Sequence, residues 1–137
     1  MYKNPTCNIC YPYDWSSDGK RIAFTEQNDK TGTDIWLVAT EGDRKPYPYL
    51  QSRFNEYWAQ ISPDGRWMVY VSDQPGQSEI LVESIPAGKG RRQISTEGGD
   101  WPVWRRDGNE LLYRQGTKIM AAPGTFNPHR DRDCTGP

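Results

Sequence analysis

Short runs of large apolar residues alternate with polar, glycine-containing segments along the chain. The clearest case is residues 58–71, where Ser-Pro-Asp-Gly at 62–65 precedes five consecutive large apolar residues at 67–71. Pro63 presets φ for a tight turn, Asp64 tolerates the bridge or left-handed region, and Gly65 accepts positive φ. An apolar run without polar alternation is typical of a strand buried on both faces. The stretch therefore predicts a strand, a tight turn and a second, buried strand.

This pattern occurs three times. The turn aspartates Asp18, Asp64 and Asp107 are 46 and 43 residues apart, and each is followed by glycine. A second apolar motif follows each turn, at 33–38, 78–82 and 117–121. A repeat of about 40–45 residues with four short strands is typical of a β-propeller blade. We therefore expect an all-β chain of three four-stranded blades, the last one incomplete, forming half of a six-bladed propeller.

The repeat places the blades at about 11–55, 56–99 and 100–127, after an N-terminal segment 1–10 and before a polar tail 128–137. A fourth strand in blade three could begin at 124–128. No segment combines helical periodicity with capping residues, so no helix is expected. The expected strands are 13–16, 21–26, 34–39 and 46–50 in blade one, 58–62, 67–72, 79–84 and 92–95 in blade two, and 102–105, 110–114 and 118–121 in blade three.

Composition and charge exclude several classes of protein. The formal net charge of −1 does not favour nucleic acid or an anionic membrane as a partner. No apolar run approaches the roughly 20 residues that a membrane span needs, so no membrane insertion is expected. No targeting pattern indicates a compartment. Six Trp, eight Tyr, 13 Gly and 11 Pro suit an all-β chain with frequent turns.

The turns carry a resemblance to a known family. Residues 62–70 resemble the signature W-S-P-D-G-[KR]-x-[IL]-[AV]-[FY] of WD40-like, TolB-type propeller repeats. Residues 15–24 depart from it only at Ser17, and the third copy departs at Arg105 and Arg106. Residues 31–36, 42–46, 54–56, 95–99, 104–108 and 124–126 are also similar to the last propeller blades appended to bacterial serine/threonine protein kinases. This resemblance implies a six- to eight-bladed sensor or protein-interaction propeller.

Enzymatic motifs are absent from the sequence. It contains no kinase motif and no G-x-S-x-G elbow, and its single histidine, His129, lies in the tail. We therefore expect a non-catalytic module. The alternative is part of a hydrolase or lyase whose site needs another chain or a missing domain. Asp18, Asp64 and Asp107 are interpreted as turn residues, and residues 29–34 lack the ligand spacing of a calcium loop. No metal and no cofactor are expected.

The cysteines have no strong interpretation. Cys7 and Cys10 form a C-x-x-C, and Cys134 lies in the tail. A zinc site would need His129 and Cys134 as its remaining ligands, and a redox motif would need a βαβ context. We expect ordinary thiols, with a local disulfide or a terminal metal clip as alternatives.

Aromatic residues at the starts of the blades are the candidate binding residues. Most tryptophans, among them Trp15, Trp36, Trp67 and Trp104, are expected to pack between blades. An aromatic patch that binds a protein or a small molecule at the ring face is the alternative. Its candidate residues are Tyr11, Tyr13, Tyr57, Trp58 and Trp101.

Three blades of a six-bladed ring would leave an apolar face bare at each end. Residues 22–24 and 35–38 in blade one, and 111–112 and 119–120 in blade three, are apolar enough to be buried on both sides. We therefore expect a homodimer that closes the ring. Residues 3–10 are expected to supply the missing outer strand of the partner's third blade.

Overall fold

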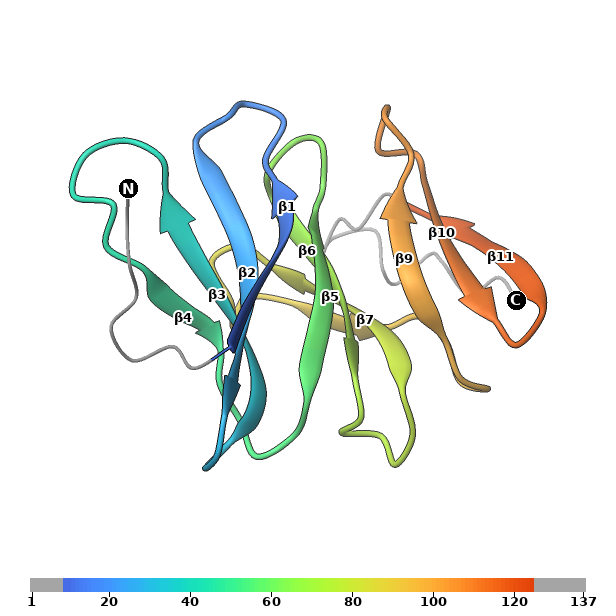
Figure 1. The fold of residues 1–137 in the computed structure, drawn as a ribbon. Helices are drawn as coiled ribbons and strands as arrows, with labels where there is room; N and C mark the ends of the chain where they lie inside the picture. The colour runs from blue at the N-terminus through green and yellow to red at the C-terminus, as the bar shows by residue number, and fades with distance from the viewer. Residues whose placement is uncertain (1–8, 125–137) are drawn as a thin grey trace.

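The computed structural model describes residues 9–124, which contain eleven strands and no helix (Figure 1). The expectation of an all-β fold is confirmed. Among these residues there is accordingly no helix long and apolar enough to cross a membrane. The strands are β1 (Ile9–Trp15), β2 (Arg21–Asn28), β3 (Gly32–Ala39), β4 (Tyr47–Leu50), β5 (Glu56–Ile61), β6 (Trp67–Ser72), β7 (Glu79–Ser84), β8 (Arg91–Gln93), β9 (Asp100–Trp104), β10 (Glu110–Gln115) and β11 (Lys118–Pro123).

The strands form three antiparallel sheets in chain order. Blade one is β1-β2-β3-β4, blade two is β5-β6-β7-β8, and the described part of blade three is β9-β10-β11. The first strands of the three blades, β1, β5 and β9, follow one another across the molecule (Figure 1). We call β1, β5 and β9 the inner strands. The expected fourth strand of blade three and the tail fall outside the described residues, apart from Gly124.

The three Asp-Gly turns have equivalent geometry, as the repeat predicts. Gly19, Gly65 and Gly108 have φ of 75°, 76° and 75°. In each turn the glycine N–H donates to the carbonyl three residues earlier at 2.9 Å. The Oδ1 atom of each preceding aspartate accepts a backbone N–H at 2.9–3.0 Å from the residue after the glycine.

The side chain that binds the turn aspartate differs in the third turn. Ser16 and Ser62 donate to their turn aspartates at 2.6 Å. Arg105 replaces this serine and forms ion pairs with Asp107 at 3.2 Å and Glu110 at 3.5 Å. The guanidinium thus contacts the aspartate that the hydroxyl binds in the other two turns.

The first strand begins earlier than expected. Pairing with the long β2 continues to Ile9 opposite Gln27 and Cys10 opposite Glu26. The strand expected at 13–16 therefore starts at Ile9, because β2 offers partners beyond Thr25. Residues 9 and 10 pair within blade one, and residues 3–8 of the expected closing segment lie outside the described residues. Cys10 is disulfide-bonded, so the expectation of ordinary thiols is wrong for this residue. Cys7 and Cys134 lie outside the described residues.

Each blade has two faces, and the core lies between neighbouring blades. We call the face turned toward the next blade the front face and the opposite one the back face. The front face of blade one packs on the back face of blade two in one apolar cluster, and the front face of blade two packs on blade three in another. The run at 67–71 lies in β6 between these clusters. All of it except Trp67 is buried, which confirms a strand covered on both faces.

Candidate binding surface on the inner strands

Each inner strand is interrupted by a bulge. The pairing register shifts between Pro12 and Asp14 in β1, between Tyr57 and Gln60 in β5, and opposite Leu112 and Arg114 for β9. The bulges lie at corresponding places in the three repeats. Such bulges re-aim side chains and are frequent beside functional sites. At the bulges, side chains of the inner strands therefore point in directions that differ from those of a regularly paired strand.

Two tryptophans in these bulges have a strained backbone. Trp58 and Trp101 have φ of 54° and 51°, in the left-handed region that side chains other than those of Gly, Asn and Asp rarely adopt. Both lie six residues before their turn aspartate, and Pro12 occupies this position in blade one. A proline ring fixes φ near −65°, so blade one lacks the feature. Strain of this kind costs on the order of 1–3 kcal/mol and clusters at functional sites.

The structure brings three of the five candidate binding residues into one aromatic group. Trp58 stacks on Trp101 with ring centroids 4.7 Å apart and an interplanar angle of 29°. Tyr57 meets Trp58 edge-on at 5.1 Å, and its hydroxyl hydrogen-bonds Ser78 Oγ at 2.8 Å. Trp101 nevertheless keeps 58% of its surface exposed. The stack therefore presents one open aromatic face to solvent.

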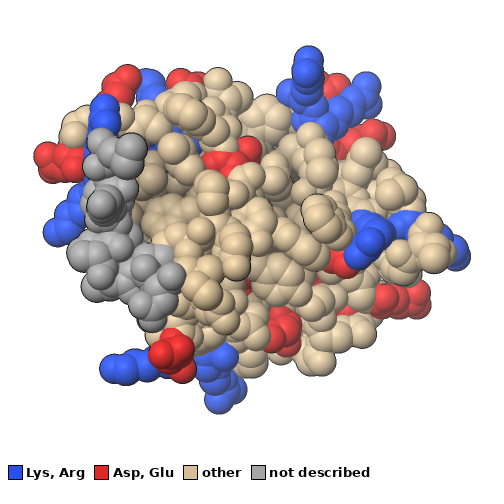
Figure 2. All heavy atoms as spheres, viewed as in Figure 1, with Lys and Arg blue, Asp and Glu red and all other residues tan. Residues whose placement is uncertain are grey.

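The other two candidates lie on β1, which contacts β5, and have no ring contact with this group. Burial, with smaller contributions from Tyr11 and Tyr57, raises the pKa of Tyr13. Tyr13 is half-buried, while Tyr11 is exposed. Together, Tyr11, Tyr13, Tyr57, Trp58 and Trp101 form what we call the aromatic surface. Figure 2 shows that uncharged side chains cover most of the middle of this face and that charged ones lie mainly toward its rim.

The inner strands carry no lysine or arginine. Their carboxylates are already engaged by the protein. Asp14 Oδ2 accepts the Ile61 N–H at 2.7 Å, Glu56 accepts Ser52 Oγ at 2.6 Å, and Asp100 forms a two-point ion pair with Arg114 at 2.7 Å. The aromatic surface is therefore suited to a neutral ligand held by stacking and apolar contact.

Polar bonds between blades hold the inner strands in place. Besides the bond from Ile61 N to Asp14, Gln60 Nε2 donates to Tyr13 O at 3.3 Å. Trp104 Nε1 donates to Gln60 O at 3.0 Å, which links blade three to blade two. Burial raises the pKa of Asp14 although two backbone N–H groups oppose this. These residues fix the spacing of the strands, and only Trp104 among them was expected at a contact between blades.

Trp15 has no neighbouring blade against it within the described residues. Its side chain is 62% exposed and donates from Nε1 to Gly19 O at 2.9 Å. It lies over its own turn because blade one has no described blade before it. Trp104 is buried between blades two and three, as expected.

Two acidic residues bind the loops that lead to the next blade. Asp34 accepts bonds from Thr31, Gln51 and the Ser52 backbone. Glu79, the corresponding residue of blade two, accepts bonds from Ser95 Oγ, Gly98 N and Gln77 Nε2. Lys118 takes this place in blade three. The hydrogen bonds to Asp34 and Glu79 thus hold the loop that connects each of the first two blades to the next one.

A buried carboxyl cluster lies at the junction of blades one and two. Burial raises the pKa of Glu56 to about 7, against the Ser52 hydrogen bond and with help from Asp34. Burial also raises the pKa of Asp34, and of Glu26, which pairs with Asp34 across β2 and β3. One oxygen of each group is buried without a hydrogen-bond partner. Within residues 9–124, no group of three or more His, Cys, Asp or Glu is placed to hold a metal ion.

Comparison with known proteins identifies the fold. A solved TolB of Agrobacterium tumefaciens matches with a TM-score of 0.71 at 22% identity, over 79% of this chain and 39% of that one. TolB of Acinetobacter baumannii matches with a TM-score of 0.67 at 17% identity, over 82% of this chain and 29% of that one. The uncharacterized peptidase YuxL of Bacillus subtilis is 26% identical over 106 residues, which are 72% of this chain and 16% of the peptidase. No known family model matches the chain.

The chain therefore has the fold of TolB-type β-propeller blades, which confirms the resemblance at the level of the repeats. It spans less than half the length of each of these relatives. The closer resemblance to kinase-appended propellers stays a prediction.

Proposed function

We propose that the chain is a non-catalytic β-propeller module that closes a six-bladed ring by homodimerisation and binds a partner at its inner strands. The observation that carries this proposal is the solvent exposure of equivalent positions on the three blades. These positions are buried wherever a neighbouring blade covers them, and they are open where none does.

The front faces show the contrast most clearly. Blade one buries Ala23, Thr25, Ile35 and Leu37, and blade two buries the equivalent Val69, Val71, Ile80 and Val82. In blade three the same four positions are exposed and hold Leu112, Arg114, Ile119 and Ala121, with Ile119 exposed to 74%. Three of the four side chains are apolar, and exposed apolar patches mark interaction sites.

The back faces show the same contrast at the other end. Blade two buries Met68, Tyr70, Leu81 and Glu83 against blade one. The equivalent residues of blade one, Ile22, Phe24, Trp36 and Val38, are only partly buried. Phe24 and Trp36 stack there with ring centroids 6.3 Å apart. Within the chain, such a back face packs against the front face of the preceding blade. Blade one thus has a back face that could pack against a front face in the same way.

A second copy supplies both missing neighbours. Two copies related by a twofold axis place blade three of each on blade one of the other, at two equal interfaces. Covering a large apolar side chain stabilises by roughly 1.5–3 kcal/mol, against a typical domain stability of 5–15 kcal/mol. In such a ring the aromatic surfaces of both copies line the central channel. This lining favours an uncharged segment of another protein that packs against the aromatic rings.

Sedimentation at low micromolar concentration tests the ring. We expect a single species of twice the chain mass, and a monomer for Ile119→Asp, which places a charge in the interface. Thr96→Asp, in the exposed loop between β8 and β9, adds the same charge away from both end faces and should stay dimeric. A folded monomer, a broad mass distribution or a dimeric Ile119→Asp would contradict the proposal.

A second candidate rests on the peptidase relative. The chain would then be the propeller part of an enzyme whose reacting groups lie in another domain or chain. Assays of the isolated chain with peptide and ester substrates separate the two candidates. We expect no turnover. Activity that survives repurification and disappears when a residue of this chain is replaced would favour the enzyme.

A further inference from the structure

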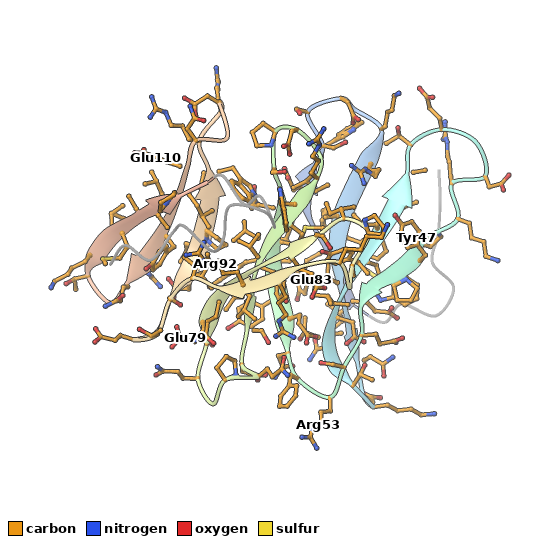
Figure 3. All side chains as sticks on the ribbon, turned by 180° about the vertical axis from the view of Figure 1, so that it is seen from behind. Tyr47, Arg53, Glu79, Glu83, Arg92 and Glu110 are labelled. Atoms are coloured by element: carbon orange, nitrogen blue, oxygen red, sulfur yellow. The ribbon has the colours of Figure 1, made fainter. Side chains whose placement is uncertain are left out.

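A pocket of about 340 Å³ lies between blades one and two, beside their outer strands. Leu37 and Ile85 line it and connect it to the apolar cluster between the blades. Its other apolar contributors include Tyr47 and Pro48 of β4, the former labelled in Figure 3, and Pro86 in the turn between β7 and β8. Both blades belong to the same copy, so the pocket does not depend on the proposed dimer.

A single charged side chain, Arg21, lines this pocket. Arg21 begins β2, and the equivalent residue that begins β6 is Trp67. The Trp67 ring lies against Gly90, just before the outer strand of blade two, within 3.6 Å of where a Cβ at Gly90 would be. Blade one thus has a guanidinium where blade two places an aromatic ring. Departures of this kind from a consistent repeat are expected at functional sites.

The guanidinium is only partly used by the protein. Arg21 Nη2 donates to Gly65 O at 2.8 Å, and no described carboxylate forms an ion pair with it. The exposed Asp18 carboxylate has its pKa lowered mainly by the hydrogen bond from Ser16, then by Lys20 N, and less by Arg21. An arginine has five N–H donors in a planar fork that matches a carboxylate. Donors therefore remain for an anion in the pocket.

We propose that this pocket binds a small, free monocarboxylate with an aromatic or branched apolar body. The carboxylate pairs with Arg21, and the body lies against Leu37, Ile85 and the proline and tyrosine side chains. The volume is at the small end of ligand pockets, which restricts the size of the ligand. One cation among apolar walls suits a single negative charge better than a phosphate.

The outer strand argues against a peptide as the source of the carboxylate. β4 is the edge of its sheet, and an extended peptide could add to it only by main-chain pairing. Pro48 removes an N–H from this four-residue strand, and proline at an edge blocks such pairing. The ligand is therefore a free molecule rather than a chain terminus.

Titration calorimetry with 3-phenylpropionate tests the proposal, and 3-phenylpropanamide serves as the uncharged match. We expect the acid to bind at millimolar concentration or tighter, and the amide to bind about tenfold more weakly or worse, because a charge-assisted bond is lost. Arg21→Gln should weaken binding of the acid by a similar factor. Arg66→Gln removes an exposed guanidinium outside the pocket and should bind as the unaltered chain does.

Several results would overturn the proposal. These are no binding of the acid, equal binding of acid and amide, or an Arg21→Gln variant that binds the acid unchanged. Tighter binding of a peptide ending in phenylalanine would overturn the assignment to a free molecule. The comparison of acid and amide uses the unaltered chain, so it tests the role of the carboxylate even if Arg21→Gln does not fold. Arg21→Lys keeps the charge without the fork and should bind with intermediate affinity.

Discussion

At the scale of single residues, the turn glycines show how tightly the fold depends on backbone conformation. Gly19, Gly65 and Gly108 all have φ near +75°, where a Cβ is unfavourable. Their surroundings differ, however. A Cβ at Gly65 would lie 2.9 Å from Arg21 Nη2, while at Gly108 the nearest atom, in Pro63, is 3.8 Å away. The same substitution should therefore have unequal effects at the two turns.

We predict that Gly65→Val lowers the free energy of unfolding by about 1 kcal/mol or more. Gly65→Ala should cost more than Gly108→Ala, because only the former displaces the guanidinium of Arg21. Urea denaturation of the variants measures both differences. Equal losses at the two turns would show that the contact with Arg21 carries no energy.

Much of the residue-level chemistry followed from the repeat. Trp58 and Trp101 occupy the same repeat position on neighbouring inner strands, so their proximity could be predicted. Their positive φ could not, because most residues in a strand sequence have extended backbone. The disulfide of Cys10 was named only as an alternative, since a C-x-x-C near a chain end has no single meaning.

At the scale of elements, the strands of each blade were predicted better than the contacts between blades. Apolar runs and Asp-Gly turns are local signals, and they placed β6 and β7 at the observed bounds. The start of β1 was missed because Cys10 and Pro12 weaken its strand pattern. The carboxyl cluster and the Arg21 pocket form only when two blades pack together. No local pattern marks Glu56 as a neighbour of Asp34.

This cluster makes stability depend on pH. The pKa of Glu56 is raised from 4.5 to about 7 in the folded chain. Between these values the folded state holds a proton that the unfolded state has lost, so stability falls as pH rises through this range. Burial raises the pKa of Glu26 and Asp34 in the same direction. We predict a higher melting temperature at pH 5.5 than at pH 8.

The variant Glu56→Gln isolates the contribution of this residue. Its melting temperature should change less between the two pH values, because glutamine keeps an acceptor for Ser52 and does not ionise. Glu41→Gln, at an exposed turn, is the matched control and should keep the full difference. An unchanged pH dependence in Glu56→Gln would show that Glu56 does not titrate in this range.

At the scale of the whole molecule, the three blades are not equivalent because only the middle one has both neighbours. Blade two buries both faces, whereas blade one has an open back face and blade three an open front face. The proposed ring joins these two unlike faces, so each interface combines one end of one copy with the other end of its partner. A variant at either end alone damages both interfaces of a dimer.

Mixing two variants then distinguishes this head-to-tail ring from other dimers. Ile119→Asp alters only front faces of blade three, and Trp36→Lys alters only back faces of blade one. We predict that each variant alone is monomeric at low micromolar concentration and that an equimolar mixture recovers dimer. In the mixed dimer one interface is unaltered, and the other pairs the new aspartate with the new lysine. A dimer joined through like faces behaves differently: one of the two variants keeps its interface unaltered and stays dimeric alone, and the mixed pair brings one altered face against one unaltered face. Sedimentation of the mixture, with Ile119→Asp plus Ala121→Asp as the control mixture, decides the matter, because both control variants alter front faces and every dimer of that mixture has two altered interfaces. Recovery confined to the first mixture supports the ring, and recovery in neither or in both contradicts it.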